Sequence, residues 1–556
     1  MRLLPAAART RTAAGLAFLA VVSLGLAGDA ATRQFFDDDP IWVDRDTENA
    51  SGMKPLDIGL TVDLAYNVIT GFSEPESVRA GNLNSVGEVP DSSWYTDRLR
   101  RGLSAADVAK GPDTTSGPAP GPWTITSSKS DGVTPGFTIK DTTGQRWFLK
   151  FDPPGYRGMA TGTEVAVTKL MWALGYNVPE NQIAYVERDR LLIGSQAKFT
   201  PAGGSTRALR ASDLDALLAQ AQREPDGAYR VVASKALDGT PIGRVRFHGT
   251  RPDDPNDIVP HQHRRELRGY GVFAAWLNHV DAKAINSLDT LVEEEGRAFV
   301  RHHLIDFGSA LGSGGIGPAD HWAGAEYLLQ PKAIAGQLWG FGFTHAKWHT
   351  APFYESPSIG RLPRDTRGFD PRQWKPRVPN QAFLHARADD RFWAAQRLVA
   401  LSTDKLRAAV SAGDFGDPAS EAFLVRWLAA RRDAIARVYL TGVNPIVAPR
   451  LERTGVLTFA NAAVDADVAR APRQYRASWF TFDNLTGATR LIADTTAVST
   501  SVPVPATLPE TDGAFIKVRL SSTGSEYASW ETPVDAYFRL RQGEWRLVGF
   551  VRLPEA

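Results

Sequence analysis

The feature that most limits how this chain can fold is a pair of polar clusters separated by two strand-like segments. The first cluster is H-V-D-A-K-A-I-N at His279–Asn286, and the second is D-F-G at Asp306–Gly308. Between them, S-L-D-T-L-V and A-F-V-R-H-H-L-I flank the turn sequence E-E-E-G-R, a pattern that predicts a β-hairpin. Because a hairpin returns the chain to its starting point, we expect Asp306 to arrive beside Asn286.

The two clusters carry the polar groups that phosphoryl transfer requires. That reaction depends on positioning and charge neutralisation: a cation on the nucleotide phosphates, oxygen ligands for a metal ion, and a carboxylate facing the acceptor hydroxyl. Aspartate and asparagine oxygens suit Mg²⁺, which keeps several water and phosphate ligands. Asp281, Asn286 and Asp306 are therefore candidates for a nucleotide-and-metal site, with a polar turn as the alternative interpretation.

A lysine far upstream supplies the missing cation. Lys150 lies in the strand-like segment R-W-F-L-K-F, so its side chain projects to the face opposite Leu149 and Phe151. Fourteen residues later, Glu164 lies near the start of a predicted helix that Gly175 ends. Glu164 is placed to pair with Lys150, although an exposed ion pair without a function is the common alternative.

These motifs together resemble those of protein kinases. H-V-D-A-K-A-I-N is similar to the catalytic loop H-R-D-L-K-x-x-N with the same spacing, and Asp306–Gly308 matches the D-F-G motif. The resemblance spans roughly Trp123 to Gly442 and is nearest to atypical branches of the protein-kinase-like superfamily, such as HipA-type toxin kinases, spore-coat kinases and secreted casein kinases. It implies ATP as the nucleotide, with Mg²⁺ or Mn²⁺.

The resemblance also implies a role for each polar residue. Asp281 and Lys283 would be catalytic, the first facing the acceptor hydroxyl and the second touching the transferring phosphate. The metal ligands would be Asn286 and Asp306. The nucleotide phosphates would be bound by Lys150, which Glu164 orients.

Three departures from the kinase pattern leave the acceptor open. Val280 replaces the arginine of H-R-D, and no A-P-E follows D-F-G. Gly132 and Gly136 do not have the spacing of a three-glycine phosphate loop. The acceptor is expected to be an unknown protein or a small molecule with a hydroxyl group, and transfer of AMP remains open.

The predicted fold class is α+β, a two-lobed protein-kinase-like fold with an N-terminal extension and a C-terminal all-β accessory domain. The expected divisions are an N-terminal wrapping segment at 31–120, a catalytic domain at 121–445 and a β-rich domain at 446–556. The small lobe would cover about 121–240, and the large lobe about 241–445. After about Ile446 the sequence turns to alternating strands and closes with a hairpin near Gly543.

The first thirty residues have the pattern of a secretory signal peptide. Arg2, Arg9 and Arg11 precede the apolar run Ala13–Ala27. As a helix this run would be about 22 Å long, which is short of a hydrocarbon core of about 30 Å. We therefore expect a secreted or periplasmic protein, with an uncleaved membrane anchor as the alternative.

Composition excludes some functions. The chain has no cysteine, which removes disulfides and thiol catalysis. With 63 basic and 62 acidic residues there is no electrostatic case for binding nucleic acid. Two other classes stay open: a nucleotide-independent envelope scaffold, with a partner bound through the C-terminal β domain, and a metal protein using the histidines found between His248 and His385.

Overall fold

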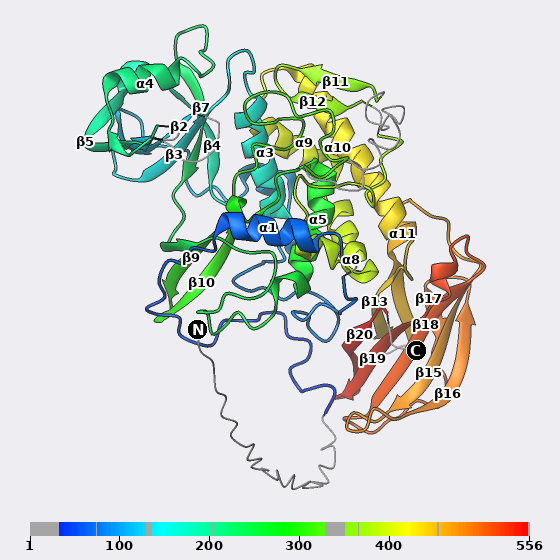
Figure 1. Ribbon diagram of the computed structural model, residues 1–556. Helices are drawn as coiled ribbons and strands as arrows, with labels where there is room; N and C mark the ends of the chain where they lie inside the picture. Colours follow the sequence, from blue (N-terminus) through cyan, green and yellow to red (C-terminus); the bar gives the residue numbers. More distant parts are fainter. Residues whose placement is uncertain are drawn as a thin grey trace, which may run out of the picture.

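The computed structural model describes residues 33–73, 75–128, 135–201, 204–328, 351–364, 366–452 and 455–553 (Figure 1). The predicted signal peptide at 1–30 and Gly132 lie outside the described residues. The fold is mixed α/β and contains a large multi-strand sheet, which is consistent with a kinase-like fold.

The largest sheet has seven strands in the order β4-β7-β3-β2-β1-β5-β6. Its strands are β1 (Trp123–Ser128), β2 (Gly136–Lys140), β3 (Arg146–Phe151), β4 (Asn181–Val186), β5 (Leu191–Phe199), β6 (Arg207–Ala208) and β7 (Tyr229–Lys235). β3 pairs antiparallel with both β2 and β7. Alternation along β3 buries Trp147, Leu149 and Phe151 in one core, which leaves Lys150 on the other face.

Helix α3 (Met159–Ala173) connects β3 to β4 and is buried over almost its whole length. It packs against the sheet on one side and against α2 (Ala105–Lys110) and α9 (Thr403–Ala412) on the other. A helix covered on both sides lacks a polar stripe, and α3 carries its Glu164 into this buried setting.

A second, larger core is built mainly by helices. Its principal members are α5 (Arg265–Leu277), α7 (Gln381–Leu384), α8 (Ala388–Val399) and α10 (Pro418–Tyr439). The apolar face of α5 lies in this core, with Leu267, Tyr270, Ala274 and Leu277 all buried. Asp417 caps α10 by accepting hydrogen bonds from two backbone N–H groups, and Pro418 opens the helix.

The predicted hairpin after Asn286 is present as β9 (Ser287–Glu294) and β10 (Arg297–Leu304), with β8 (Thr240–Gly243) beside β9. Its register pairs Ser287 with Leu304. The two polar clusters therefore meet at the open end of the hairpin.

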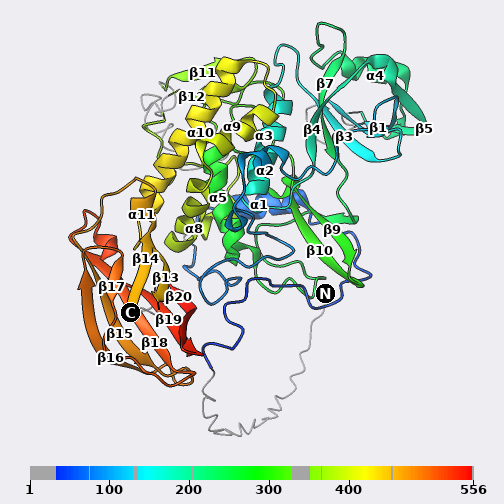
Figure 2. The same ribbon diagram turned by 180° about the vertical axis from the view of Figure 1, so that it is seen from behind.

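The last described part of the chain forms two antiparallel sheets (Figure 2). The smaller contains β13 (Ile446–Glu452), β14 (Val456–Asn461) and β17 (Ser501–Pro503). The larger contains β15 (Gln474–Phe482), β16 (Thr489–Ala497), β18 (Phe515–Thr523), β19 (Val534–Arg541) and β20 (Glu544–Val551), and the hairpin predicted near Gly543 joins the last two. This region also includes α11 (Ala462–Asp465) and the 3₁₀ turn Ala528–Trp530.

The segment before β1 runs along both the helical core and the last sheets. Phe35 lies among Phe482, Phe515 and Tyr537, with ring centroids 5.0 to 6.4 Å away. Further along, α1 (Leu60–Thr70) packs beside the turn that precedes β9.

The remaining elements are α4 (Ala211–Leu218), β11 (Phe353–Ser356), β12 (Gly360–Pro363) and the 3₁₀ turns Leu99–Arg101, Arg188–Arg190, His261–His263 and Ala284–Asn286. Within the described ranges, no helix combines the length and apolar character needed to cross a bilayer.

Candidate functional site

Three of the predicted site residues meet in one ionic cluster. Lys150 Nζ lies 3.0 Å from Glu164 Oε2 and 2.7 Å from Asp306 Oδ1. The three side chains come from β3, α3 and the segment after β10, so the cluster joins elements that are far apart in the sequence. Glu164 is almost fully buried, whereas the Asp306 side chain is 40% exposed and faces the open side.

The charge of Lys150 is stabilised by this geometry. Burial by itself would lower the pKa of the Lys150 ammonium group, but the carboxylates of Asp306 and Glu164 outweigh it and hold that pKa above its ordinary value. Lys150 therefore presents a permanent positive charge at neutral pH.

Glu164 also fixes the backbone of the D-F-G motif. Its Oε1 atom accepts a hydrogen bond from the Phe307 N–H at 2.9 Å and another from Asn181 Nδ2 at 3.3 Å. Gly308 lies so near that a Cβ atom there would be 3.2 Å from Glu164 Oε2. One carboxylate thus positions both the lysine and the chain that carries Asp306.

The other three predicted residues form a second, local cluster in the turn before β9. Asn286 Nδ2 donates to the Asp281 carbonyl oxygen at 2.8 Å and to Asp281 Oδ2 at 2.9 Å. Lys283 Nζ lies 2.7 Å from Asp281 Oδ1. Asp281 is held in place by groups from its own loop.

The backbone brings the two clusters together. The Ile305 N–H donates to the Asn286 carbonyl oxygen at 3.0 Å, one step beyond the paired Ser287 and Leu304. Asp306 itself has φ of 60°, a left-handed conformation that aspartate tolerates better than most residues. This turn directs its carboxylate toward Lys150.

His279 connects the turn before β9 to the segment that carries the D-F-G motif. It is fully buried, its Nδ1–H donates to the Ser309 carbonyl oxygen at 3.3 Å, and its ring packs 5.7 Å from that of Phe307. Burial lowers its pKa, so His279 is neutral at pH 7. Its role here is to hold the two motifs against each other.

The oxygen donors suit a hard divalent cation. Asp306 and Asn286 are the residues that would hold it, because carboxylate and amide oxygens are the ligands Mg²⁺ and Mn²⁺ accept. Among the described residues, no group of three or more histidines or acids is arranged as a metal site. Phosphate and water would therefore have to complete the coordination, which is the usual situation for Mg²⁺.

The described part of the chain contains no cluster of histidines and acids that would form the alternative histidine metal site. His261 Nε2 lies 2.7 Å from an oxygen of Asp257, and His302 Nδ1 lies 2.7 Å from an oxygen of Asp289. Each of these histidines is held by a buried carboxylate instead of facing an open site.

A cavity of about 540 Å³ opens beside the turn Asp281–Asn286. One wall is the segment Ala282–Ile285, and the opposite wall is α1 with Leu60 and Leu64. Helix α1 buries Asp63 and Asn67, and Asp63 Oδ1 lies 3.0 Å from His248 Nε2, while Leu64 stays exposed. The cavity is lined by both apolar side chains, such as Leu60 and Leu64, and polar ones, such as Asp63 and Lys283.

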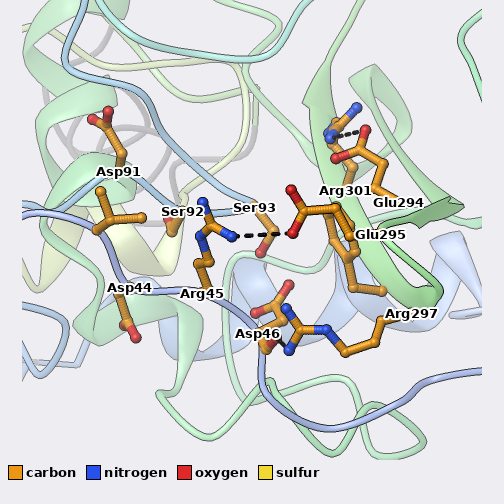
Figure 3. Close-up of a pocket in the computed structure, with 12 residues that line it drawn as sticks. Asp44, Arg45, Asp46, Asp91, Ser92, Ser93, Glu294, Glu295, Arg297 and Arg301 are labelled. Carbon is orange, nitrogen blue, oxygen red and sulfur yellow. Dashed lines mark hydrogen bonds and ion pairs between the residues drawn. The ribbon is translucent and has the colours of Figure 1, made fainter.

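A separate, charged pocket of about 270 Å³ lies at the other end of the hairpin (Figure 3). Arg45 and Glu295 bridge it at 3.2 Å, and both are exposed. The eight residues of β9 span about 26 Å, so this pocket is remote from Asp281 and Asp306. The ion pair of Arg45 with Glu295 connects the N-terminal segment to the hairpin.

Several supporting residues escaped prediction from the sequence. Asp152 accepts hydrogen bonds from the N–H groups of Gly158, Ala160 and Thr161 and so caps α3. The sequence signal that could have identified this cap is an acidic residue between a strand and a helix. Asn181, which orients Glu164, gave no local signal because its partners lie on other elements.

No protein-family model matches the chain, and no curated protein sequence matches it. In structure it is similar to the Helicobacter pylori proinflammatory kinase CtkA, at 13% identity over 55% of this chain and 92% of CtkA, with a TM-score of 0.29. It is also similar to the Golgi casein kinase, at 10% identity over 71% of this chain and 94% of that kinase, with a TM-score of 0.30.

Because both TM-scores are below 0.5, the roles of individual residues depend on the contacts within this chain and not on superposition.

Proposed function

We propose that this protein is an ATP-dependent, kinase-like phosphotransferase that acts with Mg²⁺ or Mn²⁺ on a hydroxyl acceptor. The observation that carries the proposal is the placement of Lys150 between Glu164 and Asp306. In protein kinases the corresponding lysine–glutamate pair and the D-F-G aspartate must both be in position before transfer occurs.

Each residue then has a distinct task. Lys150 neutralises the nucleotide phosphates, and Asp306 with Asn286 would hold the metal ion, which supplies further positive charge. The acceptor oxygen forms a bond to the terminal phosphorus as the bond to ADP breaks, and the acceptor proton passes to Asp281. Lys283, now paired with Asp281, is placed to turn toward the transferring phosphoryl group.

We extend the proposal to the organisation of the chain. The core formed by residues within 123–233 would be the small lobe, and the helical core the large lobe of a domain at 121–445. Residues 31–120 would wrap that domain, and 446–556 would be an accessory domain able to bind an envelope partner. The N-terminal pattern supports a secreted or periplasmic location.

The cavity of about 540 Å³ beside Ala282–Ile285 supports an acceptor approach from the side of α1. Its size is in the range of sites for small molecules, about 300 to 1,000 Å³. An acceptor bound there would reach Asp281 past Lys283.

The first test is thermal unfolding with ATP, with and without Mg²⁺ or Mn²⁺. A ligand at 100 times its dissociation constant stabilises a binding domain by about 2.7 kcal/mol. We expect a metal-dependent rise in unfolding temperature for the wild type and none for Asp306→Ala. Glu295→Gln, an exposed acid at the far end of the hairpin, is the matched control and should behave as the wild type.

Labelled ATP then identifies the group that moves. Label at the γ-phosphate should appear in the acceptor, whereas label at the α-phosphate would do so if the enzyme transfers AMP. No stabilisation by any nucleotide would contradict the proposal and favour a nucleotide-independent scaffold.

A further inference from the structure

A second cavity lies where three parts of the chain meet, away from the turn Asp281–Asn286. Its volume is about 560 Å³. Trp42 and Arg79 from the N-terminal segment, Phe392 and Trp393 from α8, and residues of β13 and β20 line it. Figure 1 shows β13 and β20 beside α8 at this junction.

Positive charge is in excess at this cavity. Four arginines line it, against the two carboxylates of Glu88 and Asp389. The arginines are Arg79, Arg265, Arg387 and Arg552.

Both lining carboxylates are already engaged by arginines. Asp389 Oδ2 lies 2.5 Å from Arg265 Nη2, and Glu88 Oε2 lies 2.5 Å from Nη2 of Arg397, which is not part of the lining. Arg265 is held further by Asp390 and the Gly87 carbonyl oxygen, which accept hydrogen bonds from its Nε and Nη1 atoms. Little negative charge is left for the remaining cations.

Of the other arginines, Arg387 shares Asp389 with Arg265, whereas Arg79 and Arg552 have no ion pair with a described carboxylate. No carboxylate that the structure describes lies within ion-pair distance of Arg79, and Arg387 Nε is 3.5 Å from Asp389 Oδ1. Arg552 donates to two backbone carbonyl groups and lies over the ring of Phe392 at 3.9 Å.

The pKa values agree with an uncompensated positive charge. Burial, and then the neighbouring Arg265, lower the pKa of Arg79. The same two causes, in the same order, lower the pKa of Arg552 to about 9. A bound anion would relieve this repulsion.

Most of the remaining wall is apolar. Phe392, Trp393, Leu547, Phe550 and Leu553 face the cavity from α8 and from the end of the chain. A free inorganic anion would leave this surface without a partner, whereas an alkyl chain would remove both the anion and the apolar wall from water.

We propose that this cavity binds an amphipathic carboxylate of the medium-chain fatty acid type. The carboxylate lies between Arg79 and Arg387, and the alkyl chain lies against Phe392, Leu547 and Phe550. Because the walls come from α8 and β20, the bound molecule fastens the last sheets to the helical core. This site is independent of the proposed phosphotransfer.

Isothermal titration calorimetry on the full chain tests the site with three probes. Octanoate has both parts of the expected ligand, 1-octanol has only the chain, and acetate has only the charge. We expect octanoate to bind one per chain and at least tenfold more tightly than either of the others. Equal binding of octanoate and 1-octanol, or no binding of octanoate, would overturn the proposal.

Two substitutions locate the binding. Arg79→Gln removes a cation that has no ion pair with a described carboxylate and should weaken octanoate binding at least tenfold, which corresponds to about 1.4 kcal/mol, with an unchanged unfolding temperature. Gln396→Trp, on the cavity wall, should block the alkyl chain. Arg45→Gln, in the remote pocket of Figure 3, should bind octanoate as the wild type does. Wild-type affinity in both Arg79→Gln and Gln396→Trp would place any binding elsewhere.

Discussion

Two lysines at the candidate site are each held by acids, but in different ways. Lys150 contacts one acid that is 14 residues away and another that is 156 residues away. Lys283 contacts Asp281, which lies in the same turn. The first cluster therefore connects the sheet, α3 and the D-F-G segment, whereas the second organises only a loop.

This difference separates stability from chemistry. Removing one partner of a buried ion pair leaves an uncompensated charge and costs several kcal/mol. Removing one partner of a local, more exposed pair costs little. The cluster of Lys150 should be needed for the fold and for ATP, and the pair of Lys283 with Asp281 for transfer alone.

The largest effect is expected from Glu164→Ala. This change leaves Lys150 Nζ and the Phe307 N–H without their buried acceptor and should lower the free energy of unfolding by about 4 kcal/mol. Urea denaturation measures the loss, and ATP stabilisation should vanish as well. Glu295→Gln, from an exposed pair, should stay within about 0.5 kcal/mol of the wild type. An equally small effect of Glu164→Ala would contradict the distinction between the clusters.

Asp281→Asn should separate chemistry from stability most sharply. Loss of a general base lowers turnover by roughly a thousandfold. The affinity for ATP should not change, because the amide keeps the shape of the side chain. The unfolding temperature should fall only slightly, because the amide can accept from only one of Asn286 and Lys283. Turnover with labelled ATP is measured beside ATP binding, and a normal rate would exclude Asp281 as the base.

Acid should weaken the hairpin that joins the clusters. Burial lowers the pKa of His303 on β10 to about 4, with smaller effects from Leu288, Arg301, His302 and Asp289. The unfolded chain takes up this proton near pH 6.5 and the folded chain only near pH 4. Stability is therefore complete above pH 6.5 and is lost between 6.5 and 4, by about 3 kcal/mol.

Denaturation of His303→Leu over the same pH range provides the comparison. The variant should be less stable than the wild type at pH 7 but should lose less stability on acidification. Parallel pH profiles of the two proteins would show that His303 does not cause the loss.

The smallest effect is expected from Gly308→Ala. The added methyl group would lie 3.2 Å from Glu164 Oε2 and would press on the carboxylate that orients Lys150. We expect a loss of about 1 kcal/mol in stability and a few-fold weaker binding of ATP. Gly296→Ala, at the hairpin turn with φ of 76°, tests whether backbone strain alone has a similar cost, and it should leave ATP binding unchanged.

Much of this arrangement could be predicted because its signals are local. Alternation along Arg146–Phe151 predicted the face of Lys150, and the turn sequence after Asn286 predicted that Asp306 would return beside it. The pairing of Lys150 with Glu164 followed from their positions in a kinase-like order.

Other parts depend on partners that are distant in the sequence. The strands β5 and β6 extend the sheet beside β1, yet β5 has few buried positions and gives a weak pattern. Helix α1 has an apolar sequence but buries Asp63 and Asn67. The ion pair of Lys283 with Asp281 depends on the rotamer of the lysine side chain, which sequence patterns do not encode.

The placement of Phe35 restricts the order in which the molecule can be completed. Its aromatic site is built by β15, β18 and β19, which are made after most of the chain. Whatever forms earlier, the first described residues must wait for the last sheets before they are fixed. Domains usually fold as their residues are synthesised, so the packing of Phe35 against these three rings is a late event in folding. In a chain truncated before Gln474, the segment around Phe35 would therefore lack its packing partners.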